Sequence, residues 1–274
     1  MGVAVAEPMY RVIADDLRSR IESGEFPAGE QLKTEVELRE KYGRADARIS
    51  RTTVRDAIKL LVAQGLVETR AGQGTFVRGR TDPFVSKLTA DPTAGGLEDE
   101  IYRSEVERQG RVPDESRPRV EVQLAPPGIG QLLQLGGGTD AQVISRHQRR
   151  SIDSTPYSMQ TTYYPMKFVT DNSATQLLDT RDMKDGAVEY LRSLGINQVG
   201  WRDQFLVRPP DTNERAFFNL SDRVQVAMLE VRRTGYDEEG RPMRVTVTVY
   251  PGDRNQFEME AGAVPSQMRE HGGE

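Results

Sequence analysis

Two arginines in one short segment have the type and spacing to read the edges of nucleic-acid bases. Arg51 and Arg55 lie four positions apart, so a helix would project both from one face. A guanidinium can donate to N7 and O6 of guanine together, and such a pair discriminates against the wrong base by about 1–3 kcal/mol. Thr52 and Thr53 can contact phosphates or thymine methyl groups, and Ser50 suits the cap that starts a helix. These residue types indicate recognition of a DNA major groove.

The charge distribution agrees with this interpretation, although the chain as a whole is acidic. The 274 residues carry a formal net charge of −5, but residues 39–80 hold 10 Lys and Arg against 4 Asp and Glu. A basic stretch inside an acidic chain is the electrostatic footprint of a nucleic-acid-binding surface. The partner that we expect is double-stranded DNA.

The composition argues against an enzyme, a metal protein, a membrane protein and a secreted protein. The chain has no cysteine and two histidines, His147 and His271, which excludes disulfides and thiolate chemistry and leaves little for a Ser-His-Asp triad. We therefore expect no catalytic residue, no metal site and no cofactor. No apolar run approaches the roughly 20 residues that span a bilayer, and the first residues lack the pattern of a secretory signal. We expect a cytoplasmic protein without membrane contact.

Three predicted helices hold the arginine pair in place. The first starts at Met9, has apolar residues at three- and four-residue spacing and is ended by Gly24. The second runs from Thr34 to Gly43, and its Thr-x-x-Glu start is the pattern of a capping box. The third begins at Ser50, ends at Gly65 and carries the arginines on its first turns.

A glycine-tipped hairpin follows the third helix. Residues 66–70 and 75–78 are β-prone runs joined by a Gly-rich turn that contains Gly72. Because Gly72 has no Cβ, its backbone can approach a phosphate or the minor groove closely. Helix, helix, turn, helix and hairpin is the plan of a winged helix-turn-helix, in which a recognition helix enters the major groove.

These blocks resemble the DNA-binding domain of the GntR family of bacterial transcription repressors. The similarity rests on residues 21–29 (Ile-Glu-Ser-Gly-Glu-Phe-Pro-Ala-Gly), residues 50–57 (Ser-Arg-Thr-Thr-Val-Arg-Asp-Ala) and the hairpin over residues 65–77. It covers most of the first domain. The resemblance implies DNA contacts from Ser50, Arg51, Thr52, Thr53, Arg55 and the wing glycine Gly72.

The chain departs from this family in two places. Val36 follows Glu35 where members usually have a DNA-contacting arginine, and residues 44–48 lengthen the turn before the third helix. We hypothesise that Arg44 or Arg48 supplies the lost contact. A solvated loop insertion is the alternative interpretation.

Beyond a linker rich in Gly, Pro, Asp and Thr, the sequence predicts a domain that mixes strands and helices. The predicted strands cover residues 120–124, 143–151, 157–164, 228–236 and 243–250, and the predicted helices cover residues 129–135, 187–194 and 212–220. Tight turns rather than helical crossovers join neighbouring strands, so we expect an α+β fold with a largely antiparallel sheet.

This second half resembles the UTRA domain of the HutC subfamily, an effector-binding module with the chorismate-lyase fold. The similarity spans about residues 98–260 and rests on residues 110–113, 149–165 and 236–242. The resemblance implies an effector pocket, whose positions are occupied here by Gln148, Arg150, Gln160, Arg244 and Tyr250. Members often have arginine at the first of these positions and glutamate at the third and fourth, so we expect a different ligand.

An anionic small molecule is the effector that these side chains suggest. Guanidinium forks pair with carboxylate or phosphate, and Arg150 and Arg244 can converge on one such group. The alternative interpretation is that Arg149 and Arg150 are surface arginines on solvated strand faces.

The sequence thus predicts a two-domain α+β protein. Residues 1–80 form a winged helix-turn-helix, 81–97 a linker, 98–265 a UTRA effector-binding and dimerisation domain, and 266–274 a polar tail. The predicted function is a homodimeric repressor that a small-molecule effector releases from an inverted-repeat operator. One alternative is a constitutive DNA-binding dimer whose second domain only dimerises. The other is a lyase-like enzyme, for which the chain lacks a recognisable acid, base and nucleophile.

Overall fold

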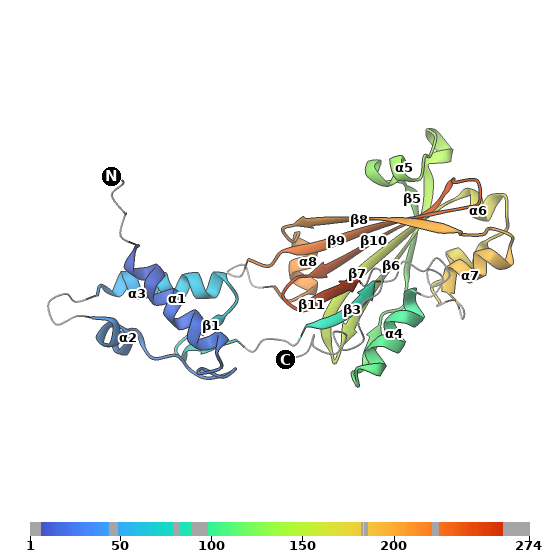
Figure 1. The fold of residues 1–274 in the computed structure, drawn as a ribbon. Helices are drawn as coiled ribbons and strands as arrows, with labels where there is room; N and C mark the ends of the chain where they lie inside the picture. The colour runs from blue at the N-terminus through green and yellow to red at the C-terminus, as the bar shows by residue number, and fades with distance from the viewer. Residues whose placement is uncertain are drawn as a thin grey trace. The chain divides into compact units, whose positions relative to one another are not determined.

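The computed structural model describes residues 7–43, 49–78, 83–88, 98–181, 183, 186–220 and 225–259. By its contacts the chain divides into two units, and most of their helices and strands are labelled in Figure 1. Unit 1 contains Met1–Pro83 and Asp211–Val226, and unit 2 contains Phe84–Pro210 and Ala227–Glu274. No helix within the described ranges combines the length and apolar character needed to cross a membrane.

Three helices of unit 1 pack around one apolar core. They are α1 (Met9–Glu22), α2 (Glu35–Tyr42) and α3 (Arg51–Ala63). Each contributes its apolar stripe, and the fully buried side chains include Ile13, Leu17, Leu38, Val54 and Leu61. The helical spacing seen in the sequence is therefore confirmed, since the residues that recur along each helix are those that the core encloses.

Side-chain caps fix where α2 and α3 begin. Thr34 Oγ1 accepts from the backbone N–H of Glu37 at 3.3 Å, and the Glu37 carboxylate accepts from the backbone N–H of Thr34 at 2.8 Å. This confirms the predicted capping box. Ser50 Oγ accepts from the backbone N–H of Thr53 at 3.0 Å and so caps α3. These caps set the directions in which the side chains of both first turns leave the helices.

The predicted hairpin forms the wing of unit 1. Its strands β1 (Val67–Arg70) and β2 (Gly74–Val77) are antiparallel. Gly72 sits at the tip with φ of +72°, a left-handed conformation that glycine adopts without strain. Gln31 Nε2 donates to the carbonyl of Gln73 at 2.8 Å, which ties the wing to the segment before α2.

A short helix from the second half of the chain belongs to unit 1. This helix, α8 (Thr212–Phe217), is capped by Asp211, which accepts from the backbone N–H of Glu214 at 2.8 Å. The backbone N–H of Gln225 donates to the carbonyl of Ala63, at the end of α3, at 3.1 Å. The helix predicted over residues 212–220 is confirmed, but its contacts group it with the first unit and not with the second.

A seven-stranded antiparallel sheet is the centre of unit 2. The strand order is β4-β6-β7-β10-β9-β8, and β5 also pairs with β6. This confirms the α+β class with a largely antiparallel sheet. The strands are β4 (Pro113–Glu115), β5 (Arg119–Leu124), β6 (Gln142–Ile152), β7 (Thr155–Pro165), β8 (Gly200–Arg208), β9 (Met228–Tyr236) and β10 (Pro242–Pro251).

Part of the predicted linker is a strand. β3 (Phe84–Leu88) pairs in parallel with β11 (Asn255–Met259), so the linker prediction over residues 81–97 is wrong for residues 84–88. Phe84 is buried and meets Tyr157 edge-on, with ring centroids 5.1 Å apart. A strand this short depends on a distant partner strand and a distant aromatic ring, and local sequence shows neither.

Helices cover parts of both faces of the main sheet (Figure 1). Ile129 and Leu133, on and just after α5, pack on the face that carries Val143 and Val245. On the other face, Phe168 and Leu191 pack with Ile144, Tyr164 and Met243. The helices of unit 2 are α4 (Glu98–Arg108), α5 (Pro127–Leu132), α6 (Lys167–Thr170) and α7 (Gly186–Ser193).

The middle of that second face is polar although it is buried. In the strand register Gln148 lies opposite Gln160, and Gln160 lies opposite Thr248. Residues opposite one another, and residues two apart on a strand, share a face of a sheet. We call the set of buried polar side chains on this face the polar face; it comprises Arg146, Gln148, Arg150, Ser158, Gln160, Thr162, Arg244, Thr246 and Thr248.

Candidate functional site

The two arginines singled out by their spacing project into solvent from the first turns of α3. The side chains of Arg51 and Arg55 are 60% and 53% exposed. Glu35, on the first turn of α2, lies between them. Arg55 Nε donates to Glu35 Oε1 at 2.8 Å, and Arg51 Nε lies 3.4 Å from Glu35 Oε2. The arginines are therefore accessible, and both are ion-paired with one acid.

The other predicted DNA contacts of unit 1 are divided between α3 and the wing. Thr52 is exposed beside the arginines, whereas Thr53 is half-buried with Oγ1 2.8 Å from Ser50 Oγ. Gly72 is exposed at the tip of the wing. The structure thus brings the predicted α3 residues together at the start of one helix, with Gly72 on the separate hairpin.

The hypothesis for a replacement contact concerns residues that the structure leaves out. Arg44 and Arg48 both lie outside the described residues. Val36, at the position where the replaced arginine would stand, is 50% exposed next to Glu35. The surface next to Glu35 is therefore partly apolar.

The residues predicted for the effector pocket lie on one face of the main sheet. Gln148, Arg150, Gln160 and Arg244 are buried on the polar face, and Tyr250 is half-buried at its margin. The interpretation as a solvated surface arginine is therefore wrong for Arg150, which the fold encloses, whereas Arg149 is exposed. Tyr250 packs edge-on against Tyr157, with ring centroids 5.7 Å apart.

Arg150 is held by three neighbours of different chemistry. Its Nε donates to Glu115 Oε1 at 2.8 Å, its Nη1 donates to Gln160 Oε1 at 2.9 Å, and its guanidinium lies 5.1 Å from the centre of the Tyr102 ring. Burial raises the pKa of Tyr102 to about 12, so the phenol stays neutral. Glu115 and Tyr102 come from elements that the sequence analysis did not connect with Arg150.

Arg244 donates hydrogen bonds to two neutral side chains. Its Nε donates to Gln198 Oε1 and its Nη1 donates to Thr246 Oγ1, both at 2.8 Å. Gly235 makes this arrangement possible, because a Cβ at that position would overlap the Gln198 side chain. Thr246 Oγ1 in turn lies 3.1 Å from Thr162 Oγ1. A buried guanidinium with hydroxyl and amide neighbours is well suited to an anion.

Ser158 is a polar-face residue that the sequence analysis missed. It lies opposite Arg150 in the strand register and is fully buried. Its Oγ has no hydrogen-bond partner among the residues that the structure describes. An unsatisfied buried hydroxyl costs free energy unless a ligand or water completes it. Alternation along β7 could have identified it, since Ser158 and Gln160 are two positions apart.

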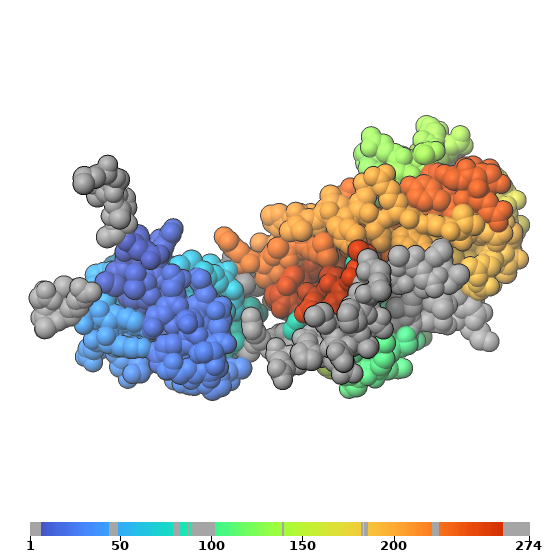
Figure 2. Space-filling view, viewed as in Figure 1, coloured from blue at the N-terminus to red at the C-terminus, as the bar shows by residue number. Residues whose placement is uncertain are grey.

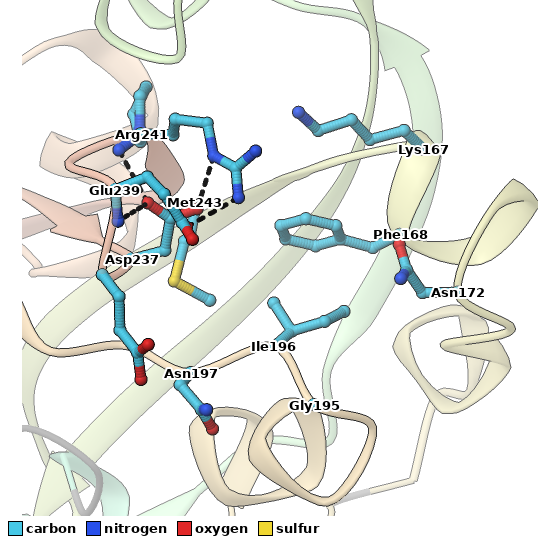
Figure 3. Close-up of a pocket in the computed structure, with 12 residues that line it drawn as sticks. Lys167, Phe168, Asn172, Gly195, Ile196, Asn197, Asp237, Glu239, Arg241 and Met243 are labelled. Atoms are coloured by element: carbon cyan, nitrogen blue, oxygen red, sulfur yellow. Dashed lines mark hydrogen bonds and ion pairs between the residues drawn. The ribbon is translucent and has the colours of Figure 1, made fainter.

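A cavity of about 390 Å³ lies elsewhere in unit 2, next to the β9–β10 turn. Its floor is formed by Phe168, Ile196 and Met243 (Figure 3). At its rim Arg241 Nε donates to Asp237 and Arg241 Nη2 donates to Glu239, both at 2.8 Å. In Figure 2 the orange surface of α7 and the following loop adjoins the red-orange surface of this turn. The charged residues that line this cavity are Lys167, Asp237, Glu238, Glu239 and Arg241, and acids outnumber bases among them. The polar face is therefore the better site for an anion.

The described part of the chain contains no candidate metal-binding cluster. No group of three or more His, Asp or Glu side chains within it is placed to hold an ion.

Two family models match the chain, one over the first segment of unit 1 and one over the main sheet of unit 2. Residues 9–77 match the model of "Bacterial regulatory proteins, gntR family", and residues 108–256 match the model of the UTRA domain. The first match covers α1 to the wing. The second covers all seven strands of the main sheet, including every predicted effector residue.

Similar proteins extend over nearly the whole chain. The HTH-type transcriptional regulator GgaR of Escherichia coli (strain K12) is 22% identical over 241 residues, 88% of this chain and 86% of that protein. The HTH-type transcriptional repressor NagR of Bacillus subtilis (strain 168) is 24% identical over 250 residues, 91% of this chain and 93% of that protein. A crystal structure of a GntR-family transcriptional regulator superposes with a TM-score of 0.69 at 23% identity, covering 94% of this chain and 99% of that one, and so shares its fold.

Proposed function

Since the chain belongs to the gntR family of bacterial regulatory proteins and carries a UTRA domain, we propose that it is a repressor released from its operator by a small-molecule effector. It is a DNA-binding transcriptional regulator. The direction of regulation, the form of the operator and the chemistry of the effector are the parts that we propose. NagR, a similar protein, is named a repressor, which supports this direction.

The observation that carries the proposal is the exposed arginine pair on the first turns of α3. Arg51 and Arg55 project from the end of the helix that meets base edges in this class of motif. Each can bind N7 and O6 of a guanine, and Thr52 beside them can contact a phosphate or a thymine methyl. Gly72 at the wing tip allows a close backbone approach to the DNA.

The polar face is the proposed effector site, and an anion is the proposed effector. Arg150 and Arg244 supply two buried guanidinium groups on one face, and Ser158 supplies a hydroxyl that lacks a partner among the described residues. Gln148, Gln160 and Tyr250 complete the set. A carboxylate or phosphate group could accept from these guanidinium groups and from the Ser158 hydroxyl at the same time.

A homodimer is the proposed assembly, and the edge strand β8 supports it. β8 is at one end of the main sheet within the described residues, and it exposes Phe205 at 53% and Val207 at 74%. An apolar edge strand favours pairing with a second strand. A two-fold dimer would bind an inverted repeat whose half-sites lie about one helical turn, roughly 10 base pairs, apart.

Selection of bound duplexes from random DNA tests the proposal. We expect an enriched inverted repeat, and we then expect an anionic metabolite to release the protein from it. To change occupancy from 99:1 to 1:99 the effector must prefer the DNA-free state by about 5.5 kcal/mol. Enrichment of a repeat with no releasing metabolite would favour a constitutive DNA-binding dimer. No enrichment at all would refute the proposal.

A further inference from the structure

The carboxylate of Glu35 contacts both Arg51 and Arg55, in each case at the Nε atom of the arginine. Glu35 Oε1 accepts from Arg55 Nε at 2.8 Å, and Glu35 Oε2 lies 3.4 Å from Arg51 Nε. The Nε group is on the inner edge of the guanidinium, next to the aliphatic stem. The outer edge, with the two terminal Nη groups, is the fork that pairs with N7 and O6 of guanine. The ion pairs therefore leave this outer edge available.

The position of Glu35 is itself fixed by the fold. It is the first residue of α2, directly after the capping box of Thr34 and Glu37. Leu38, one turn along, is buried in the core of unit 1. Arg39 Nε donates to the carbonyl of Ile49 at 3.0 Å, which ties α2 to the segment that starts α3. The carboxylate is thus held at a defined place beside the recognition helix.

Fixing an arginine before it meets DNA lowers the cost of binding. An arginine side chain carries about 2 kcal/mol of rotamer entropy, and this is lost when it binds a base in one orientation. A side chain that is already oriented in the free protein loses less, so specific binding is favoured. A carboxylate near the DNA also repels phosphates, which weakens binding to every sequence equally.

We propose that Glu35 is a positioning residue that orients Arg51 and Arg55 for base recognition, trading general DNA affinity for sequence discrimination. The proposal rests on the proposed function, because it assigns Glu35 a role in the same protein–DNA interface. The proposal predicts opposite changes in two quantities, the affinity for random DNA and the ratio of operator affinity to random affinity. Removing the carboxylate raises affinity for random DNA and lowers the ratio of operator to random affinity.

The test compares two charge-matched variants of the full chain, Glu35→Gln and Asp56→Asn. Asp56 is on α3, the helix of the two arginines, and pairs with Lys59 at 3.1 Å. Its variant therefore removes one negative charge without removing a contact of Arg51 or Arg55. Fluorescence anisotropy at one fixed salt concentration gives Kd for the selected operator and for a random duplex. We expect Glu35→Gln to lower the operator-to-random ratio about 10-fold, equivalent to about 1.4 kcal/mol, and Asp56→Asn to leave it unchanged.

Affinity for a modified operator distinguishes a role of Glu35 in base recognition from a role in folding alone. Replacing the contacted guanines by 7-deazaguanine removes the N7 acceptor that the arginine fork uses. The wild-type chain should lose about 10-fold in affinity for this operator, whereas Glu35→Gln should lose less than about 3-fold. Thermal melting of both variants checks that the fold is intact.

The outcomes separate this role from the proposed function. A wild-type chain that prefers no duplex would overturn both. A wild-type chain that selects an operator, together with a Glu35→Gln variant that keeps its ratio within about 2-fold, would overturn the role of Glu35 alone. An equal loss of the operator-to-random ratio in Glu35→Gln and Asp56→Asn would also overturn the role of Glu35, because it would indicate an effect of charge alone. A Glu35→Gln variant whose base preference changes only at a single cytosine would overturn it too, because a carboxylate that accepts from cytosine N4 contacts the base directly.

Discussion

Replacing Glu115 by alanine should destabilise unit 2 strongly. Its side chain is 3% exposed and pairs at 2.8 Å with Arg150, which is 5% exposed. Removing one partner of a buried ion pair leaves the other charge buried alone, at a cost of about 3–5 kcal/mol. The second partner of Glu115, Arg103, is 52% exposed, so the loss of that contact adds less than about 1 kcal/mol.

Trp201 makes the effect measurable in unit 2 alone. It is the single tryptophan of the chain and lies on β8, with the guanidinium of Arg233 4.8 Å from its ring centre. Urea unfolding followed by its fluorescence therefore reports the main sheet. With a denaturant slope of about 2 kcal/mol per molar, Glu115→Ala should lower the unfolding midpoint by about 2 M.

Two further variants decide whether the ion pair is the cause. Glu121→Ala removes an exposed acid that pairs with Arg119 on the neighbouring strand β5, and it should cost less than about 1 kcal/mol. The double variant Glu115→Leu with Arg150→Met replaces both charges by apolar groups and should recover about half of the loss or more. If Glu115→Ala cost no more than Glu121→Ala, the reasoning from burial would be refuted.

Three other changes test the DNA interface, the core of unit 1 and the histidine of the main sheet. Arg55→Ala should weaken operator binding by about 1–3 kcal/mol in a gel-shift titration without changing the melting temperature; a Kd within 2-fold of wild type would contradict the recognition role. Leu61→Ala should lower the unfolding free energy of unit 1 by about 2–5 kcal/mol in a urea titration followed by far-UV circular dichroism, whereas the exposed Val36→Ala should change it little. Burial, helped by two neighbouring arginines, lowers the pKa of His147 below its usual 6.5, so the unfolded chain binds the proton first and stability falls as pH drops below 6.5. His147→Gln should flatten that decline in pH-dependent melting, and an unchanged slope would show that His147 does not cause it.

The local features of the fold could be predicted from the sequence. The three helices of unit 1, the capping box at Thr34, the Ser50 cap and the wing all follow from spacing and residue type within about a dozen neighbours. The β6–β7 and β9–β10 hairpins follow in the same way from their turns. What could not be predicted depends on residues far apart in the chain. β3 needs β11 beside it, and the membership of α8 in unit 1 needs the contact with the end of α3.

In the candidate sites too, the local spacing of residues could be predicted from the sequence, but the contacts between distant residues could not. The spacing of Arg51 and Arg55 indicated a recognition surface, but the acid between them is on another helix, 20 positions before Arg55. Likewise the sequence indicated Arg150 as a pocket residue, whereas its burial and its pairing with Glu115, 35 positions away, appear once the sheet is assembled. Residue type reveals what a side chain can do, and the register of distant strands determines what it meets.

The grouping of Asp211–Val226 with the first 83 residues gives the protein an unusual connectivity. The backbone passes between the two units three times, after Pro83, after Pro210 and after Val226. A recombinant piece that stops at residue 80 would consequently omit a part of its own unit. The excursion that carries α8 leaves after β8 and returns before β9, so two paired strands of the main sheet lead into and out of unit 1.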